Sequence, residues 1–342
     1  MKRFITVLVI MSVLLGIFSA CARPDNNFES DSKAESDSKQ ATDKPIEDNK
    51  VDENETQSDV NDESGKADGE NPSDINPDGG GEASGKNYIR ENNYIYFGEY
   101  PQTLKKSGVI VSTTPDSRGY FLGNDNAYYA KVVASPYESG YKFSNDSNVV
   151  NGSEYYFKVE PIKWRILSES DGCAILLCES IIENKCYDLE TNNYKESDVR
   201  KWLNDTFYNS AFNELERALI QAFTVDNSLS TTGYSENPNI CDNTEDKIFL
   251  LSYSDVTDTK YGFATDISRM RRASDYTLAK GAWISTSKSS EYYGHGLWML
   301  RTPNNTYTHF IRECSFNGEI TDGGTNLVNS FFGVVPALKI KL

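Results

Sequence analysis

The chain has 342 residues, which at roughly 100–200 residues per domain allows one large domain or two ordinary ones. Its formal net charge is −17, from 34 basic and 51 acidic residues, and this argues against nucleic-acid binding, which needs clustered Lys and Arg. Apolar residues make up only 38% of the chain, yet aromatic residues reach 12%. The composition therefore predicts a polar segment beside an aromatic-rich domain.

The N-terminus has the layout of a secretory signal peptide covering residues 1–20. Lys2 and Arg3 precede an apolar run over 4–18, which is shorter than the roughly 20 residues of a membrane span. The run ends in the sequence F-S-A-C at 18–21, which resembles the lipobox of bacterial lipoproteins. The resemblance implies that Cys21 carries fatty acyl chains such as palmitate and anchors the protein at the extracellular face of the membrane. An ordinary signal peptide with a chance cysteine, or an uncleaved anchor, is the alternative.

Residues 21–86, which begin with Cys21, have the composition of a disordered linker. Between residues 22 and 86 there are 19 acidic and 7 basic residues, and Phe28 is the one aromatic residue. Such a segment cannot bury enough apolar surface to offset the entropy of ordering it. We expect a charged spacer that holds the domain away from the membrane; an acidic interaction tail is the alternative.

The remaining residues, 87–342, are expected to form one globular domain with strands early and late in its sequence. Asp171-Gly172 and Asn317-Gly318 are hairpin turn signals, and the apolar run 173–178 indicates a strand buried on both faces. Alternating or β-branched and aromatic runs predict strands at 94–97, 156–160, 163–167, 173–178, 297–300, 307–315, 319–321 and 334–340.

Helix signals occupy the middle of this domain. Ser197 is an N-cap candidate for a helix over 198–203, and Ser274 for a short helix through Lys280 that Gly281 ends. Ser210 is a candidate cap for another helix. The predicted buried face of that helix consists of Phe212, Leu215, Leu219 and Phe223. Strands, then helices, then strands with long loops predict an α+β fold.

The sequence carries few residues that suit a metal, a cofactor or a nucleophile. The two histidines, His295 and His309, cannot build a three-histidine site, and neither lies in an H-E-x-x-H motif. We therefore expect no metal and no cofactor. No two cysteines of the domain have C-x-x-C spacing, and their pairing cannot be read from the sequence. These cysteines are Cys173, Cys178, Cys186, Cys241 and Cys314.

Carboxylates offer one enzymatic hypothesis. Glu179, Glu183, Asp188 and Glu190 follow the predicted buried strand, and further acidic residues lie between 236 and 246. Two carboxyl groups about 5–9 Å apart suit glycoside hydrolysis. The alternative interpretation of these residues is a solvated loop.

The region after residue 290 combines Tyr, Trp, Asn and Arg, which is the chemistry of a binding surface. Tyrosine and tryptophan give large rigid contact areas, and asparagine adds adaptable hydrogen bonds, so the region would suit a sugar or a protein loop. The alternative is that these rings fill the core of a loop-rich fold. The candidate ligand-binding residues are Tyr292, Tyr293, His295, Trp298, Arg301, Asn304 and Asn305.

Four motifs occur in order, S-D-V-R-K-W-L-N at 197–204, D-K-I-F-L-L-S at 246–252, W-M-L-R-T-P at 298–303 and G-V-V-P-A-L at 333–338. Over about 92–342 the chain resembles a secreted domain of unknown function common in gut Firmicutes. It departs from that pattern at Leu297, Thr302 and Val335, where the family has Trp, Ser and Arg.

The resemblance implies a single domain with the C-type-lectin-like fold, which formylglycine-generating enzymes share, although fold does not determine function. The oxidase chemistry of those enzymes needs a cysteine pair that we cannot identify here. Arg301 is expected to pair with a buried carboxylate rather than to contact ligand. We expect a non-enzymatic surface lipoprotein that binds glycan or protein; a cell-wall or glycan hydrolase and a structural envelope protein are the alternatives.

Overall fold

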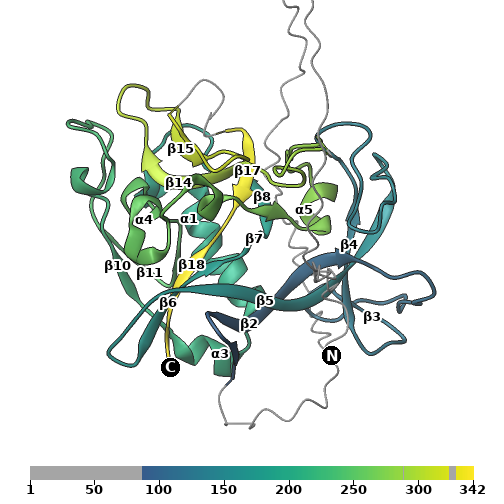
Figure 1. Cartoon of the computed structure of the whole chain (residues 1–342). Helices are drawn as coiled ribbons and strands as arrows, with labels where there is room; N and C mark the ends of the chain where they lie inside the picture. Colours follow the sequence, from purple (N-terminus) through teal and green to yellow (C-terminus); the bar gives the residue numbers. More distant parts are fainter. Residues whose placement is uncertain (1–86, 288, 323–328) are drawn as a thin grey trace, which may run out of the picture. The chain divides into compact units, whose positions relative to one another are not determined.

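The structure is a computed structural model, and it describes residues 87–287, 289–322 and 329–342. The expected signal peptide (1–20), the acyl anchor at Cys21 and the acidic linker (21–86) lie outside the described residues. The fold is α+β as predicted, rich in strands, with short helices and long loops (Figure 1).

The larger sheet is built around one long strand, β5 (Glu154–Ser170). Strand β2 (Tyr94–Leu104) lies along one edge of β5, and β4 (Tyr128–Val133) and β6 (Cys173–Cys178) follow one another along the other edge. The predicted strands at 94–97, 156–160, 163–167 and 173–178 all fall in this sheet. Its other strands are β1 (Ile89–Glu91), β3 (Phe121–Leu122), β9 (Ile220–Gln221), β12 (Ile248–Phe249) and β18 (Ala337–Lys341).

The turn between β5 and β6 forms as its sequence predicts. Asp171 and Gly172 have φ values of 52° and 68°, as the two central residues of a type I′ hairpin turn require. Strand β6 then runs between β5 and the closing strand β18, with Leu176 and Leu177 fully buried. This central position explains the wholly apolar run.

The smaller sheet contains five strands, in the order β16, β15, β14, β17, β8, and lies in the upper part of Figure 1. Two predictions need correction here. The strand expected over 307–315 begins only at Ile311, because residues 304–310 form a loop, and the closing strand expected over 334–340 is two strands separated by Val335-Pro336. The strands are β8 (Glu183–Cys186), β14 (Trp298–Pro303), β15 (Ile311–Cys314), β16 (Ile320–Thr321) and β17 (Phe331–Val334).

Two of the three predicted helix starts are confirmed. The side chain of Ser197 accepts the N–H of Arg200 at the start of α1 (Asp198–Trp202), and Ser274 caps α5 (Asp275–Ala279). The prediction for Ser210 is wrong. Asn213 caps α3 (Glu214–Leu219) in a capping box with Glu216, whereas Ser210 lies inside α2 (Tyr208–Ala211) and donates to the carbonyl of Phe207. The buried face predicted for that helix fails with it, since Leu215 is 65% exposed and Phe223 lies on a strand.

The remaining elements are short, and they include two further sheets of two strands each, β10 with β11 and β7 with β13. One hydrophobic core joins the sheets, and it includes Trp164 of β5 and Trp298 of β14, both fully buried. No helix among the described residues is long and apolar enough to cross a membrane. These short elements are α4 (Tyr253–Thr257), β7 (Ser180–Ile181), β10 (Phe223–Val225), β11 (Thr244–Asp246), β13 (Arg272–Ala273), a π-helical turn (Leu203–Phe207) and 3₁₀ turns at Tyr194–Glu196, Leu229–Thr231, Thr259–Tyr261 and Asp266–Arg269.

Candidate functional site

Residues 304–310 form the loop that joins β14 to β15, and we call this segment the braced loop. The buried side chain of Asn192 makes several of the hydrogen bonds that fix its backbone. The side-chain amide of Asn192 donates hydrogen bonds to the carbonyls of Tyr307 (3.0 Å) and Phe310 (2.8 Å). The backbone N–H of Asn192 donates to the carbonyl of Thr308 at 2.7 Å. Asn192 is 2% exposed, so water competes little for these bonds.

Three more asparagines fix the first turn of the braced loop. The amide of Asn237 donates to the carbonyl of Pro303 (3.0 Å), and that of Asn239 donates to the carbonyl of Asn304 (2.8 Å). The side-chain oxygen of Asn304 accepts the backbone N–H of Thr306 at 2.8 Å. Asparagine suits this task because a short side chain carries both donors and an acceptor. The conformation of the loop is therefore determined by the domain itself.

The braced loop presents three rings that contact one another, and we call them the aromatic tip. Tyr307 is 54% exposed, His309 is exposed and Phe310 is half-buried. The ring centroids of His309 and Phe310 are 4.5 Å apart, and those of Tyr307 and Phe310 are 5.5 Å apart. Asn305, a predicted ligand-binding residue, is half-buried beside them. A ligand would meet rings whose supporting backbone is already ordered.

A second group of half-buried rings lies on the segment before β14. Tyr292, Tyr293 and His295 are each partly exposed, as a role in binding would need. The Tyr292 ring packs edge-on against Phe316 at 5.8 Å, and Phe316 contacts Trp283 at 5.3 Å. These contacts leave partial faces of the rings toward solvent, so this segment is a subsidiary candidate surface.

His295 is uncharged at neutral pH in this setting. Burial and then the positive charge of Arg272 lower the pKa of its imidazole below the ordinary value of 6.5. The two residues form an antiparallel bridge, and Arg272 also donates to the carbonyl of Tyr293 at 2.8 Å. His295 would therefore contribute hydrogen bonds rather than charge to a ligand.

Three of the predicted ligand-binding residues are buried and bonded within the domain. Trp298 is fully buried and its indole N–H donates to the carbonyl of Arg269 (3.0 Å). Arg301 is 5% exposed and donates to the carbonyl of Leu250 and to the carboxylate of Asp255, both at 2.7 Å. Asn304 is also buried. These side chains position the strand and loop, and the ion pair agrees with the structural role expected for Arg301.

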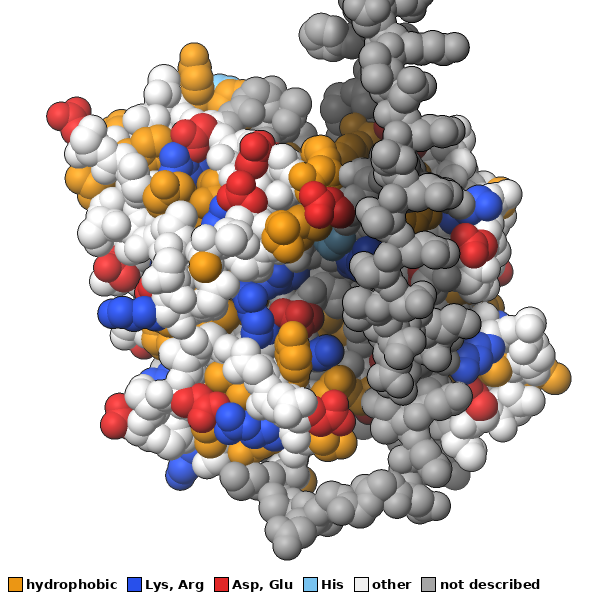
Figure 2. Space-filling model, viewed as in Figure 1, with side chains coloured by type: hydrophobic (Ala, Val, Ile, Leu, Met, Phe, Trp, Pro, Cys, Tyr) orange, Lys and Arg blue, Asp and Glu red, His pale blue; other side chains and the backbone are white. Residues whose placement is uncertain are grey.

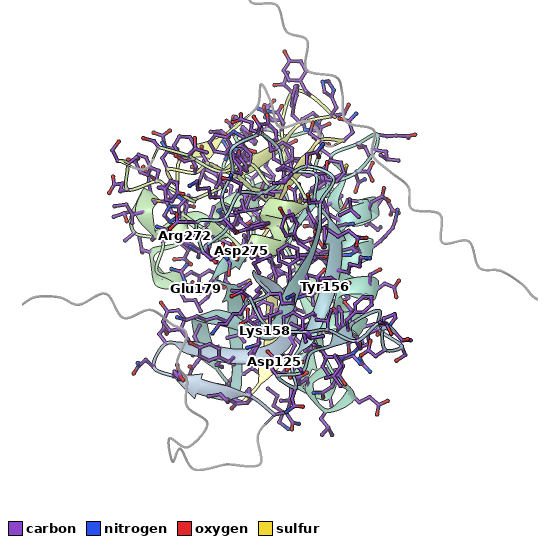
Figure 3. All side chains as sticks on the ribbon, turned by 90° about the vertical axis from the view of Figure 1, so that its right-hand side faces the viewer. Asp125, Tyr156, Lys158, Glu179, Arg272 and Asp275 are labelled. Atoms are coloured by element: carbon purple, nitrogen blue, oxygen red, sulfur yellow. The ribbon has the colours of Figure 1, made fainter. Side chains whose placement is uncertain are left out.

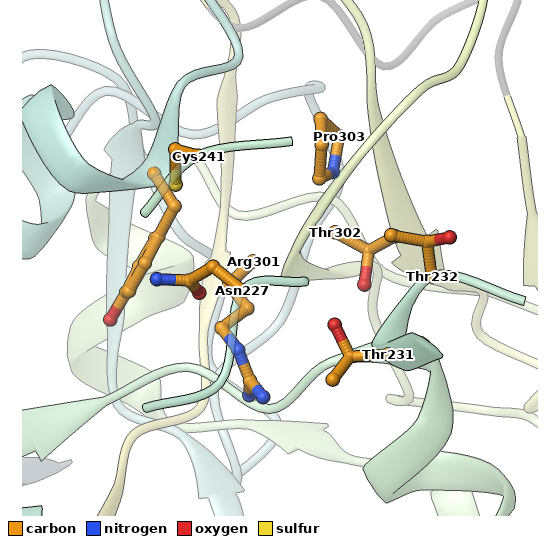
Figure 4. Close-up of a pocket in the computed structure, with 8 residues that line it drawn as sticks. Asn227, Thr231, Thr232, Cys241, Arg301, Thr302 and Pro303 are labelled. Atoms are coloured by element: carbon orange, nitrogen blue, oxygen red, sulfur yellow. The ribbon is translucent and has the colours of Figure 1, made fainter. Parts of the chain in front are cut away.

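A small pocket lies beside Arg301 (Figure 4). The Nε of Arg301 and the side-chain oxygen of Asn227 have no hydrogen-bond partner among the described residues. The pocket has room for about one water molecule, which would bond to both groups. Its size fits a structural water rather than a ligand. The lining residues are Tyr194, Asn227, Thr231, Thr232, Cys241, Arg301, Thr302 and Pro303.

Several of the carboxylates that suggested a hydrolase are paired with basic, hydroxyl or backbone N–H groups of the domain. Glu183 pairs with Lys280 at 2.6 Å and accepts the hydroxyl of Tyr100 at 2.9 Å. Asp188 accepts the backbone N–H of Glu190 (2.9 Å), and the side chain of Glu190 itself is exposed. In the stretch 236–246, Asp242 pairs with Lys195 (2.9 Å) and Asp246 with Arg200 (2.7 Å). This arrangement gives the hydrolase hypothesis no further support.

Sequence reasoning missed Glu313 and three of the four asparagines that brace the loop, Asn192, Asn237 and Asn239. Burial raises the pKa of the Glu313 carboxyl to about 7, and one of its oxygens has no partner among the described residues. The run Asn237-Pro238-Asn239 is recognisable as turn chemistry. Its hydrogen-bond acceptors lie 65 and 66 residues away, so no local pattern could reveal them.

In the part of the domain that the structure describes, cysteine and acidic side chains do not cluster as metal ligands would. Among the described residues, no group of three or more His, Cys, Asp and Glu side chains could hold a metal ion. Cys173, Cys178, Cys241 and Cys314 are free thiols. Burial raises the pKa of Cys178 to about 12 and raises that of Cys314 as well, so both buried thiols stay protonated.

Comparison with known protein families matches residues 171–342 to the family described as Domain of unknown function (DUF6273). The match covers half of the chain, and the chain belongs to this family. The expected membership of a domain family of unknown function is thereby confirmed, although over a shorter range than 92–342. No curated protein and no solved structure matches the chain.

Proposed function

We propose that this protein is a bacterial surface lipoprotein whose domain binds a glycan or protein ligand outside the cell without catalysing a reaction. Cys21 would carry the acyl anchor at the extracellular face of the membrane, and the acidic segment to residue 86 would serve as the spacer. The charged start, the apolar run and the F-S-A-C sequence support the anchor. A C-type-lectin-like arrangement of the domain, with long loops on short strands, is part of the proposal.

The aromatic tip on the braced loop is the observation that carries the binding function. Exposed rings of this kind are poor solvent contacts but good ligand contacts, because they give large area at low cost in side-chain entropy. Asn192 holds two of the three ring-bearing residues through their carbonyls, which reduces the ordering cost of binding. Sugars and protein loops both suit a ring surface flanked by amide groups.

A glycan array probed with the full chain in detergent micelles tests this function. We expect a restricted set of glycans to give signal, and we expect the double variant Tyr307→Ala, His309→Ala to lose at least about tenfold in affinity. Tyr137→Ala is the matched control, because Tyr137 is another exposed tyrosine (48%) outside the loop. An array without signal, combined with measurable hydrolysis of peptidoglycan, would favour the hydrolase instead.

The anchor is tested separately by metabolic labelling with a radioactive fatty acid. The wild-type chain should incorporate label and sediment with membranes, whereas Cys21→Ser should do neither. A mature chain that keeps residues 1–20, or an unlabelled Cys21, would refute the anchor without affecting the binding proposal.

A further inference from the structure

Two arginines from distant parts of the chain converge beside β6, and we call them the arginine pair. Arg165 comes from β5 and Arg271 directly precedes β13. The Nη1 atoms of both guanidinium groups donate to one backbone carbonyl, that of Ser268, at 3.5 Å and 3.2 Å. Arg271 Nη1 also donates to the carbonyl of Met270 at 2.7 Å. One end of each guanidinium is therefore fixed to the backbone.

The other edge of each guanidinium has no hydrogen-bond acceptor in the part of the chain that the structure describes. The Nε and Nη2 atoms of Arg165 and of Arg271 are buried and have no acceptor among the described residues. The side chain of Arg271 is 4% exposed and that of Arg165 is 15% exposed. Buried donors without acceptors are rare in native proteins, and each one needs an explanation. In each arginine, the two unpaired atoms form the edge of the guanidinium group that binds an oxyanion through two parallel hydrogen bonds.

In the part of the chain that the structure describes, Glu179 is the carboxylate that pairs with both arginines, but it does not complete their hydrogen bonds. Its Oε1 lies 3.6 Å from Arg165 Nε and 3.8 Å from Arg271 Nη2, and it too is without a hydrogen-bond partner among the described residues. The Glu179 side chain is 26% exposed, so it has a path to solvent. One loosely held carboxylate thus faces two fixed cations.

The arginine pair stays charged at neutral pH although it is buried, and two aromatic rings pack against it. Burial lowers the pKa of Arg271 to about 10, which still leaves it protonated at neutral pH. The Phe263 ring lies 4.7 Å from the guanidinium carbon of Arg165, and the Trp298 ring 6.0 Å from that of Arg271. Arg272 adds a further positive charge on the same side of the domain as Glu179 (Figure 3). Figure 2 shows a face of the molecule on which basic and acidic side chains are interspersed.

We infer that the arginine pair is an oxyanion-binding site, and that Glu179 is its built-in occupant, which an acidic ligand displaces toward solvent. A carboxylate or phosphate oxygen pair would accept from the Nε and Nη2 atoms of both arginines, bonds that Glu179 Oε1 alone does not make. Binding would replace the carboxylate of Glu179 with another anion, so the two arginines would keep a negatively charged partner. The site uses other residues than the aromatic tip and does not depend on the function proposed for that tip.

Isothermal titration of the full chain in detergent with inorganic phosphate and with acetate, at constant ionic strength, tests this site. We expect saturable binding of at least one anion. Glu179→Gln removes the competing carboxylate and should tighten binding about tenfold, whereas Arg165→Gln should weaken it at least about tenfold. Preference for acetate would identify a carboxylate ligand, and preference for phosphate would identify a phosphorylated one.

Arg118→Gln is the matched control, because Arg118 is a surface arginine paired with Asp116 at 3.1 Å, and its replacement should leave anion binding unchanged. Circular dichroism melting establishes that each variant is folded. If Arg165→Gln fails to fold, Glu179→Gln still decides the question. A folded Glu179→Gln variant that binds neither anion would overturn the inference, since the arginines would then serve only to neutralise Glu179.

Discussion

Glu183 on β8 and Glu313 on β15 are both 3% exposed, but they differ in the number and charge of their hydrogen-bonding partners. Glu183 has a cation, a tyrosine hydroxyl and a backbone N–H as partners, from Lys280, Tyr100 and Asn184. Among the described residues, the side chain of Glu313 accepts one hydrogen bond, from the hydroxyl of Thr321 at 3.1 Å. The three donors around Glu183 offset the cost of burying a charge, whereas burial beside a single donor raises the pKa of Glu313 and so favours its protonated form. The fold thus tolerates a buried acid in two distinct ways.

Removing the cation beside Glu183 should have the largest effect on stability. Lys280→Met leaves Glu183 buried without its counter-ion, and we expect a loss of about 3 kcal/mol in the free energy of unfolding. The surroundings raise the pKa of Lys280 above 10.5, through Glu183 and Tyr276 against the opposing effect of burial. A raised lysine pKa contributes its full stabilisation at every pH below 10.5. The variant should therefore show the whole expected decrease in the free energy of unfolding at neutral pH.

Urea unfolding at pH 7 measures this loss. Lys131→Met is the matched control, because its partner Glu154 lies at 2.7 Å but both side chains are at least one-third exposed. That variant should change the free energy of unfolding by less than about 1 kcal/mol. Equal effects of the two variants would mean that burial does not strengthen the Glu183 pair.

Neutralising Glu313 should have the opposite effect and stabilise the fold. The pKa of Glu313 is about 7 in the folded chain against an ordinary 4.5, so the folded state loses stability as the pH rises from 4.5 to 7. Glu313→Gln removes this penalty. We expect the variant to be more stable than the wild type by about 3 kcal/mol at pH 8 and equal to it at pH 4.5. A variant that is less stable at pH 8 would show that Glu313 has an anionic role.

A smaller loss should follow from removing one neutral partner of Glu183. Tyr100→Phe deletes the hydroxyl that donates to Glu183 at 2.9 Å, which should cost about 1.5–3 kcal/mol because the acceptor is charged and buried. Tyr137→Phe, at an exposed tyrosine, should change stability by less than about 0.5 kcal/mol. Chemical unfolding of both variants decides this, and indistinguishable midpoints would contradict the prediction.

Local features of this domain were predictable from the sequence. The caps at Ser197 and Ser274, the turn at Asp171-Gly172 and the buried run 173–178 depend on residues within a few positions of one another. The Ser210 cap failed although it obeys the same rule, because Asn213 three residues later makes a complete capping box. The sequence does rank the two caps, because Glu216 stands three residues after Asn213, as a capping box requires, whereas the glutamate after Ser210 stands four residues later.

The candidate sites depend on contacts that no local pattern encodes. Asn192 reaches the carbonyls of Tyr307 and Phe310 across 115 and 118 residues, and Arg165 reaches Ser268 across 103. The sequence indicated that the region after residue 290 is rich in rings and amides. It could not separate the exposed rings from Trp298, because both satisfy the same composition and only the packing of β14 buries one of them.

The smallest expected effect concerns the hydrogen bond that Thr321 donates to Glu313. Thr321→Val should cost about 1 kcal/mol at pH 8, where Glu313 is charged, because its hydroxyl is the donor. The loss should also raise the pKa of Glu313 further, since that hydrogen bond lowers it. Making the change in the wild type and in Glu313→Gln cancels the other interactions of Thr321, which both backgrounds share. A coupling energy near zero at pH 8 would show that the Thr321 hydroxyl does not stabilise the charged form of Glu313.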